Sequence, residues 1–326
     1  MAIKLGKKRD EAGYGLGRYI IEVGDEALIE VEDLRNRIVE AFGSPDYQPP
    51  ALPSTALELL ALSRDPDASF DEIVALLEQD AVLAASVLRA AQSPLYAGIG
   101  GVQSLHQALV RLGLATLRDL VLEVAVNLRV FAVPAYAPSA ERLRRHSAAV
   151  AQLARLVARH ARVESELAFL CGLFHDVGIA GILLTLGDVP PGEKPPDLGV
   201  LWPAIDAAHE EAGALMAILW ELPQELPLVI GGHHQLPTDA EAQALGAVVC
   251  VADRLAEELG AGLVPRAEEA AASDELAALA TFERTDRSSD GAVERARETL
   301  GVDDAAWERL REEGAALLAR LRDAGD

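Results

Sequence analysis

The sequence has few aromatic residues for its length. Only 4 % of its 326 residues are Phe, Trp or Tyr, although half are hydrophobic and most of these are Ala, Leu or Val. Aromatic and β-branched residues concentrate in β-sandwiches, whereas Ala and Leu favour helices, so this balance predicts packed helices. We therefore expect an all-α protein with a well-buried interior.

Basic residues are also scarce. The chain carries 29 Lys and Arg against 52 Asp and Glu, for a formal net charge of −23. Such a surface repels phosphate backbones and anionic lipids, so we expect no nucleic-acid partner and no membrane partner. A short basic cluster near the N-terminus, Lys4 to Arg9, is too small to change this expectation.

Cysteines and long apolar runs are likewise rare. The two cysteines, Cys171 and Cys250, lie in apolar sequence, which predicts buried reduced thiols and a cytoplasmic location. No 18 consecutive residues are apolar, and no signal-peptide pattern opens the chain. Export and membrane spanning are therefore disfavoured.

The N-terminal region permits two interpretations. Residues 1–17 are polar and rich in glycine, which suggests a flexible leader. The next residues favour a helix that ends near Gly43, but YIIEV and ALIEV can also pair as a hairpin over residues 19–31. Four prolines in GSPDYQPPALP then exclude a continuous helix and indicate an extended entry into the main domain.

Helix start signals dominate the segment that follows. Three pairs match the capping box, in which a hydroxyl and a carboxylate or amide satisfy backbone N–H groups at a helix start. Asp80 can cap a further helix, and Gly113 is suited to the left-handed residue after a helix end. The three capping pairs are Thr55 with Glu58, Ser69 with Glu72, and Ser104 with Gln107.

A second helical block follows PAYAPSA. We predict helices at about residues 139–161, 164–175, 201–221, 224–231 and 240–259, with the segment GDVPPGEKPPDLG as an exposed loop. Beyond Asp253 the chain stays rich in Ala and Glu, which predicts further helices up to its end.

Histidines gather in the second block. Five of the seven lie on separate predicted helices or helix ends, and the HD dipeptide occurs within CGLFHDVGIAG. Imidazole and carboxylate groups delivered from different helices are how helical bundles build internal metal sites. The alternative is that these histidines are buried core residues whose rings form hydrogen bonds with the backbone. The set, in chain order, is His146, His175-Asp176, His209, His233-His234 and Asp253.

This order, together with AQSPLY and SLHQALVRLG in the first block, resembles the HDOD family, the HD-related output domain of bacterial signalling. The resemblance implies a multi-helical fold over residues 48–258, in which an N-terminal helical half (48–135) packs on an HD-like core (136–258). Residues 1–47 are then an N-terminal extension, and residues 259–326 a C-terminal helical extension.

The resemblance also implies a ligand set. His146, His175, Asp176 and Asp253 match the residues that bind the first metal in HD enzymes. His209, His233 and His234 match those that bind an additional metal in HD-GYP phosphodiesterases, with Asp176 bridging. One or two ions of iron, manganese or zinc suit such a set. In an enzyme, Asp176 would act together with metal-bound water.

Three positions depart from the catalytic pattern. Ile179 stands where those enzymes have a phosphate-gripping lysine, and the chain reads HHQLP, with Gln235 and without a GYP motif. Arg142 stands one turn before the first histidine, where a carboxylate ligand can occur. Beside a metal, Arg142 and Arg145 are candidates for binding an anionic ligand.

The favoured function is a non-catalytic bacterial signalling module that binds a protein partner, with a metal or an anionic nucleotide at the HD site. Metal-dependent hydrolysis of a nucleotide or cyclic dinucleotide is the alternative, and a purely structural scaffold is the third hypothesis. A cyclic dinucleotide or another nucleotide is the candidate small-molecule partner, and a homo-oligomer is left open.

Overall fold

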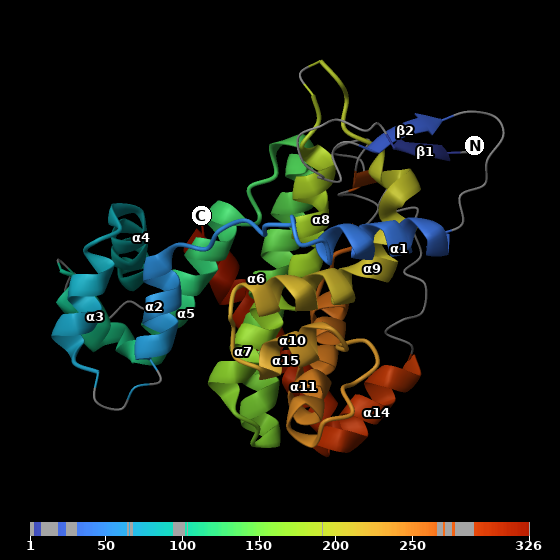
Figure 1. Cartoon of the computed structure of the whole chain (residues 1–326). Coiled ribbons are helices and arrows are strands. Elements are labelled where there is room, and N and C mark those ends of the chain that lie inside the picture. The colour runs from blue at the N-terminus through green and yellow to red at the C-terminus, as the bar shows by residue number, and fades with distance from the viewer. Residues whose placement is uncertain are drawn as a thin grey trace. The chain divides into compact units, whose positions relative to one another are not determined.

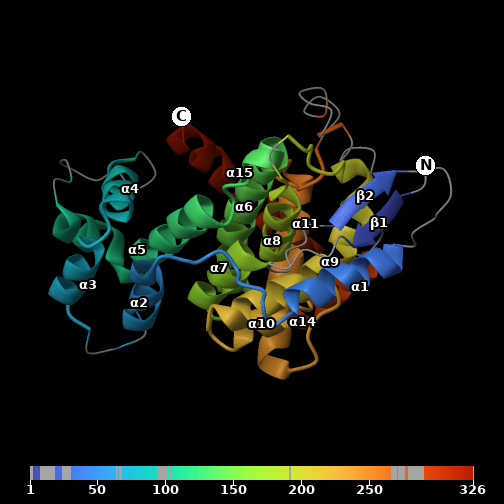
Figure 2. The same cartoon turned by 45° about the horizontal axis from the view of Figure 1, so that its top comes forward.

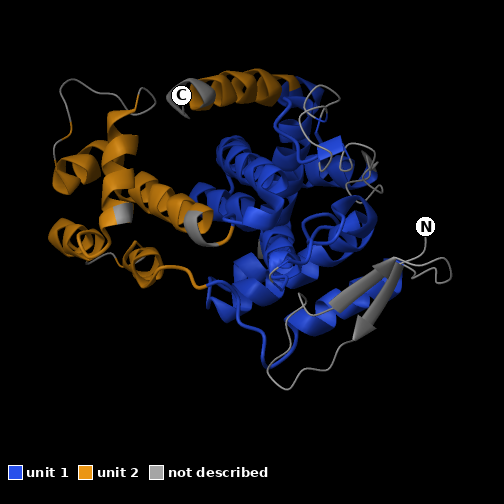
Figure 3. Ribbon diagram, turned by 90° about the horizontal axis from the view of Figure 1, so that it is seen from above, with its two compact units in different colours: residues 1–50, 131–307 blue, residues 51–130, 308–326 orange. Residues whose placement is uncertain are grey.

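The computed structural model of the protein describes residues 3–7, 19–23, 31–63, 65, 68–93, 102, 104–190, 192–265, 270, 276–277 and 290–325. The chain divides into two compact units, coloured separately in Figure 3. The first unit comprises residues 1–50 and 131–307, and the second comprises residues 51–130 and 308–326.

A two-stranded antiparallel sheet lies near the N-terminus. Strand β1 (Ile3–Lys7) pairs with β2 (Tyr19–Val23), so that Ile3 is opposite Val23. The expectation of a flexible leader over residues 1–17 is therefore wrong for Ile3–Lys7, where Ile3 and Leu5 lie two residues apart on either side of Lys4, as in a strand. YIIEV does form a strand, but its partner is this segment; most of ALIEV lies outside the described residues.

Helices make up the remaining regular structure among the described residues, and the all-α prediction is confirmed. In the first unit, α6 packs on α7 and α11, and α8 packs on α9. Figures 1 and 2 show this bundle from two sides. Its elements are α1 (Val31–Phe42), the 3-10 turn η2 (Pro134–Tyr136), α6 (Ala137–Ala161), α7 (Ser165–Phe174), α8 (Val177–Gly187), α9 (Leu198–Leu219), α10 (Glu225–Ile230), α11 (Ala240–Glu258) and α14 (Asp290–Leu300).

The stretch Ser165–Gly187, which contains α7 and α8, is the apolar centre of this unit. Among the described residues it alone is long and apolar enough to cross a membrane, but 89 % of its most apolar 18-residue window is buried within the protein. The sequence did not predict α8, because VGIAGILLTLG is apolar all round and has no polar face to mark a helical period. Cys171 and Cys250 are buried free thiols, as predicted.

A close approach fixes α8 against α9. A Cβ at Gly178 would lie 2.0 Å from the carbonyl oxygen of His209 and 2.6 Å from the amide nitrogen of Gly213. Only glycine permits the two backbones to come this near. The contact sets the distance between Asp176, which precedes α8, and His209 on α9.

Helix α1 also packs on α9. Arg35 donates through Nη2 to Glu211 at 2.6 Å and through Nε to the carbonyl of Ala207 at 3.2 Å. Phe42, at the end of α1, is 2 % exposed, and the helix ends there as predicted. Helix α1 therefore supports α9.

In the second unit, α2, α3 and α4 pack against α5 (Figure 1). Ser69 and Glu72 form the predicted capping box, Ser104 accepts from the Gln107 amide, and Asp80 accepts from the amide of Leu83. The elements are α2 (Ser54–Leu62), α3 (Phe70–Leu77), α4 (Ala81–Gln92) and α5 (Leu105–Arg129); α15 (Asp304–Gly325) begins in the first unit and continues in the second.

Two local predictions have different outcomes. Gly113 has φ of 75° at a kink within α5, as expected of a residue between two helical segments. The capping box at Thr55 is wrong, because α2 begins one residue earlier, at Ser54, and its N-cap Pro53 offers no side-chain acceptor. Thr55 is instead buried, at 7 % exposure.

Candidate metal centre

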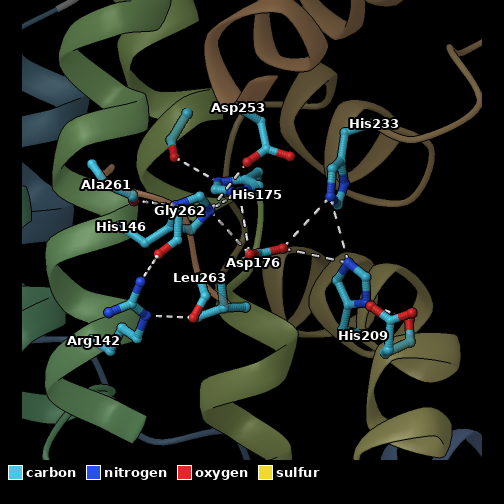
Figure 4. A network of polar contacts seen from close by, with 12 residues as sticks. Arg142, His146, His175, Asp176, His209, His233, Asp253, Ala261, Gly262 and Leu263 are labelled. Atoms are coloured by element: carbon cyan, nitrogen blue, oxygen red, sulfur yellow. Dashed lines mark hydrogen bonds and ion pairs between the residues drawn. The ribbon is translucent and has the colours of Figure 1, made fainter. Parts of the chain in front are cut away.

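Six segments of the first unit deliver polar side chains to one buried point (Figure 4). The side chains belong to the seven residues that were predicted from the sequence to be metal ligands. Each of these residues is at most 3 % exposed. His146 lies on α6, His175 follows α7, Asp176 precedes α8, His209 lies on α9, His233 and His234 follow α10, and Asp253 lies on α11.

The first group of donors contains His146, His175 and Asp253. The Nε2 atoms of the two imidazoles are 3.3 Å apart, and Nε2 of His146 is 3.3 Å from Oδ1 of Asp253. Oδ2 of Asp176 lies 3.5 Å from Nε2 of His146 and 3.3 Å from Nε2 of His175. Four donor atoms thus surround one small volume.

The second group contains His209, His233 and His234 together with Asp176. Nε2 of His209 and Nε2 of His233 are 3.5 Å apart. They lie 3.4 Å and 3.6 Å, respectively, from Oδ1 of Asp176. The two oxygens of one carboxylate therefore face two different pairs of imidazoles, which is the arrangement of a bridging ligand.

Backbone carbonyls orient four of the imidazoles through Nδ1. His175, His209 and His233 each contact the carbonyl three residues earlier, at 2.8, 2.6 and 2.9 Å. His146 contacts the carbonyl of Ala261 at 2.9 Å. A carbonyl only accepts, so each Nδ1 carries the proton, and in a neutral ring Nε2 presents a lone pair to the centre.

Acceptors therefore face acceptors in a dry interior. Both oxygens of Asp176 are buried and have no hydrogen-bonded partner among the described residues. Opposed lone pairs of this kind require a cation between them, either a proton or a metal ion. Two ligand atoms about 2.1 Å from one ion and about 100° apart are about 3.2 Å from each other. The observed separations, 3.3–3.6 Å, fit a metal ion with little movement.

The pKa values describe how protons occupy the centre without metal. Burial favours the neutral acid for Asp176, but His175, His146 and His233 outweigh it and hold the pKa of this carboxyl well below its usual range. Burial lowers the pKa of His146, and Asp176 and Asp253 reverse this and raise it to about 10. For His209 burial prevails and the pKa is lowered. A metal must displace protons to bind, so protons and metal compete.

Glu210 is a component that the sequence did not select. It is 8 % exposed, and its Oε1 accepts from the amide of His234 at 3.1 Å and lies 3.8 Å from Nδ1 of His233. It thereby fixes the turn that carries both histidines. Its position directly after His209 was the available signal, but Glu211 beside it is the same residue type and is exposed, so the sequence did not separate the two.

The two arginines proposed as anion ligands lie in other contacts. Arg142 donates through Nε and Nη2 to the carbonyls of residues 262–264, and Arg145 donates to the exposed carboxylate of Glu141. The anion-ligand interpretation therefore has no support in their geometry. Ile179 is 1 % exposed, so the position that carries a lysine in the HD-GYP pattern is part of the apolar core.

Comparisons with known proteins agree with this architecture. The profile of the HDOD domain matches residues 50–236. An HDOD domain protein of unknown function from Geobacter sulfurreducens is 25 % identical, with a TM-score of 0.62 over 90 % of this chain and 98 % of that one. A provisionally named metal-dependent phosphohydrolase from Shewanella amazonensis, 17 % identical with a TM-score of 0.56 over 85 % of this chain and 99 % of that one, shares the fold.

One curated relative also matches. An uncharacterized protein from Treponema pallidum is 25 % identical over 218 residues, which are 64 % of this chain and 42 % of the relative. The chain thus spans less than half the length of that protein.

Proposed function

The chain belongs to the HDOD family, and we propose that it is a bacterial signalling module whose HD-like core binds two metal ions that share Asp176. The observation that carries the proposal is the pair of Asp176 oxygens, each buried and each facing two imidazole nitrogens. Iron, manganese and zinc suit a mixed nitrogen and oxygen set.

Burial of the donors favours a structural or sensing role for the ions over turnover. None of the seven ligands is more than 3 % exposed, so a phosphate ester has no exposed ion to approach. The lysine that binds phosphate in the HD-GYP pattern is also replaced here, by Ile179, which is buried in the core. We propose that the module acts in the cytoplasm through a protein partner, and that metal loading sets the shape it presents.

Phosphohydrolysis is the second candidate. The complete donor set favours it, because two ions can polarise a phosphate while lowering the pKa of a bound water. In that case Asp176 would hold both ions, and a nucleotide or cyclic dinucleotide would be the substrate.

Metal analysis tests the first proposal. Protein purified without chelator should contain close to two equivalents of transition metal, and Asp176→Asn, which keeps the size of the side chain but removes its charge, should contain far less. Glu141→Gln, which changes a half-exposed carboxylate on α6, is the matched control and should keep its metal. A metal-free wild-type protein that stays metal-free after incubation with iron, manganese and zinc would refute the proposal.

Turnover separates the two candidates. The metal-loaded protein is incubated with cyclic dinucleotides, nucleotides and phosphate esters. The signalling module should release no product above the Asp176→Asn background. Hydrolysis at enzyme-like rates that this variant abolishes would establish the second candidate instead.

A further inference from the structure

The chain turns sharply where α11 ends, beside the metal centre. Gly260 has φ of 81°, its amide donates to the carbonyl of Glu257 at 3.1 Å, and the amide of Ala261 donates to the carbonyl of Ala256 at 2.7 Å. This pair of bonds around a left-handed glycine is the Schellman motif, which ends a helix and redirects the chain. We call residues 260–264 the strap.

The strap contacts a metal-ligand candidate directly. The carbonyl of Ala261 accepts from Nδ1 of His146 at 2.9 Å, and this bond sets which nitrogen of the ring faces the centre. Leu263 is 3 % exposed, so the strap is packed against the protein. The position of the strap therefore controls the orientation of His146.

One side chain holds the rest of the strap. Arg142 donates through Nε to the carbonyl of Leu263 at 2.6 Å, and through Nη2 to the carbonyls of Gly262 at 2.7 Å and Val264 at 2.9 Å. Arg142 and His146 are four residues apart on α6 and so share one helix face, as Figure 4 shows. Hydrogen bonds from a charged donor are the strong ones, and three consecutive carbonyls are held by one guanidinium.

A pocket that is partly open to solvent lies next to this contact. A cavity of about 150 Å³ is lined by Arg142, Glu257 and three strap residues, Gly260, Gly262 and Val264. That volume is large enough to hold several water molecules. The strap thus has space beside it, unlike the densely packed α7 and α8.

We propose that Arg142 latches the strap over the metal centre, and that release of this latch is the route by which ions enter and leave. The ligands are at most 3 % exposed, so an ion reaches them only when a covering segment moves. The strap has a glycine hinge, a cavity beside it and a single side chain that binds three of its carbonyls. Arg142 is therefore a positioning residue: it acts on His146 through the carbonyl of Ala261. The exchange route rests on the proposed metal binding; the latch itself does not.

Hydrogen exchange of the metal-free protein tests the latch. Arg142→Gln removes the charge and most of the donors, and the amides of residues 261–264 should then exchange roughly ten- to hundred-fold faster, as expected for the loss of charge-assisted hydrogen bonds. The control is Arg145→Gln on the same helix, whose side chain is exposed and bonded to Glu141; its strap should exchange like the wild type. Unchanged strap exchange in Arg142→Gln would overturn the proposal.

Metal release tests the gate. Zinc-loaded protein is mixed with an excess of a chromogenic chelator, and release should be faster in Arg142→Gln by roughly the same factor. Equal release rates in Arg142→Gln and wild type would refute the gating role. If neither the wild type nor any variant binds zinc, iron or manganese, the proposed function fails, while the exchange experiment still decides the latch.

A conservative variant guards against a general folding defect. Arg142→Lys keeps the charge but cannot reach three carbonyls at once, because an ammonium lacks the planar fork. Its strap exchange and zinc release should fall between those of wild type and Arg142→Gln, with thermal unfolding near that of the wild type. Equal effects of Lys and Gln with protection lost throughout α6 would indicate a structural role only and overturn the latch.

Discussion

The two compact units bury charge in opposite ways. In the second unit Arg118 and Asp119 are each 3 % exposed, and Arg118 donates to Asp119 through Nη2 at 2.7 Å and Nε at 3.0 Å. In the first unit Asp176 is equally buried but faces imidazole nitrogens at 3.3–3.6 Å. The second unit pairs its carboxylate with a guanidinium of the same chain, whereas the first surrounds its carboxylate with imidazoles in an arrangement that could hold a metal ion.

Removal of one partner of the buried pair should give the largest effect. Asp119→Ala leaves the guanidinium of Arg118 buried without that carboxylate, which should lower the free energy of unfolding by about 3–5 kcal/mol. Denaturant unfolding followed by circular dichroism measures this. Metal content per folded protein should stay that of the wild type; a loss of metal would contradict the independence of the two units' charge arrangements.

Metal removal should affect the first unit selectively. With free metal at a hundred to a thousand times its Kd, chelation should cost roughly 3–4 kcal/mol of unfolding free energy. All three tryptophans, Trp202, Trp220 and Trp307, lie in the first unit, so their fluorescence reports on it. Hydrogen exchange in α2–α5 should not change on chelation. Equal loss of protection in both units would remove the distinction.

The contact between α8 and α9 offers a steric test of the first unit. A methyl group at Gly178 must push the helices apart, so Gly178→Ala should cost about 3 kcal/mol and reduce metal content, because Asp176 moves from His209. Gly43→Ala is the control, since its Cβ would meet its nearest atom, the carbonyl oxygen of Val39, at an ordinary 3.4 Å. Chemical denaturation and metal analysis of both variants check the prediction. Equal stability and equal metal content of the two variants would show that the close approach is unimportant.

A helix cap gives the smallest effect. Ser69→Ala removes the side-chain acceptor at the start of α3, which should cost about 1 kcal/mol. The loss is measured by thermal unfolding, and zinc release from the first unit should keep its rate. An effect below a few tenths of a kcal/mol would mean that the capping box contributes nothing in the second unit.

Local signals predicted much of this molecule, and contacts distant in sequence account for what they missed. The caps at Ser69, Asp80 and Ser104 and the left-handed Gly113 depend on a few neighbouring residues, so the sequence reveals them. Helix α8 was not predicted, because it is buried on all sides and its sequence therefore shows no alternation between apolar and polar residues at the helical period. The carbonyl of Ala261 lies 115 residues from His146. No residue type at position 261 marks it as a partner, since any residue offers the same carbonyl.

The candidate site shows the same division. The histidines and aspartates could be selected because their residue types carry the chemistry. From the sequence, Arg142 was predicted to bind an anionic ligand, because a positively charged side chain near a metal site can attract an anion. The structure gives it three carbonyls of the strap instead, a role that depends on how the chain turns at Gly260.

Anomalous X-ray diffraction from crystals of the metal-loaded protein tests the central claim most directly. The account predicts two anomalous peaks on either side of the Asp176 carboxylate. One should lie about 2.0–2.3 Å from Nε2 of His146 and His175, and the other at the same distance from Nε2 of His209 and His233. Clear density for all four imidazoles with no anomalous peak between them would contradict it.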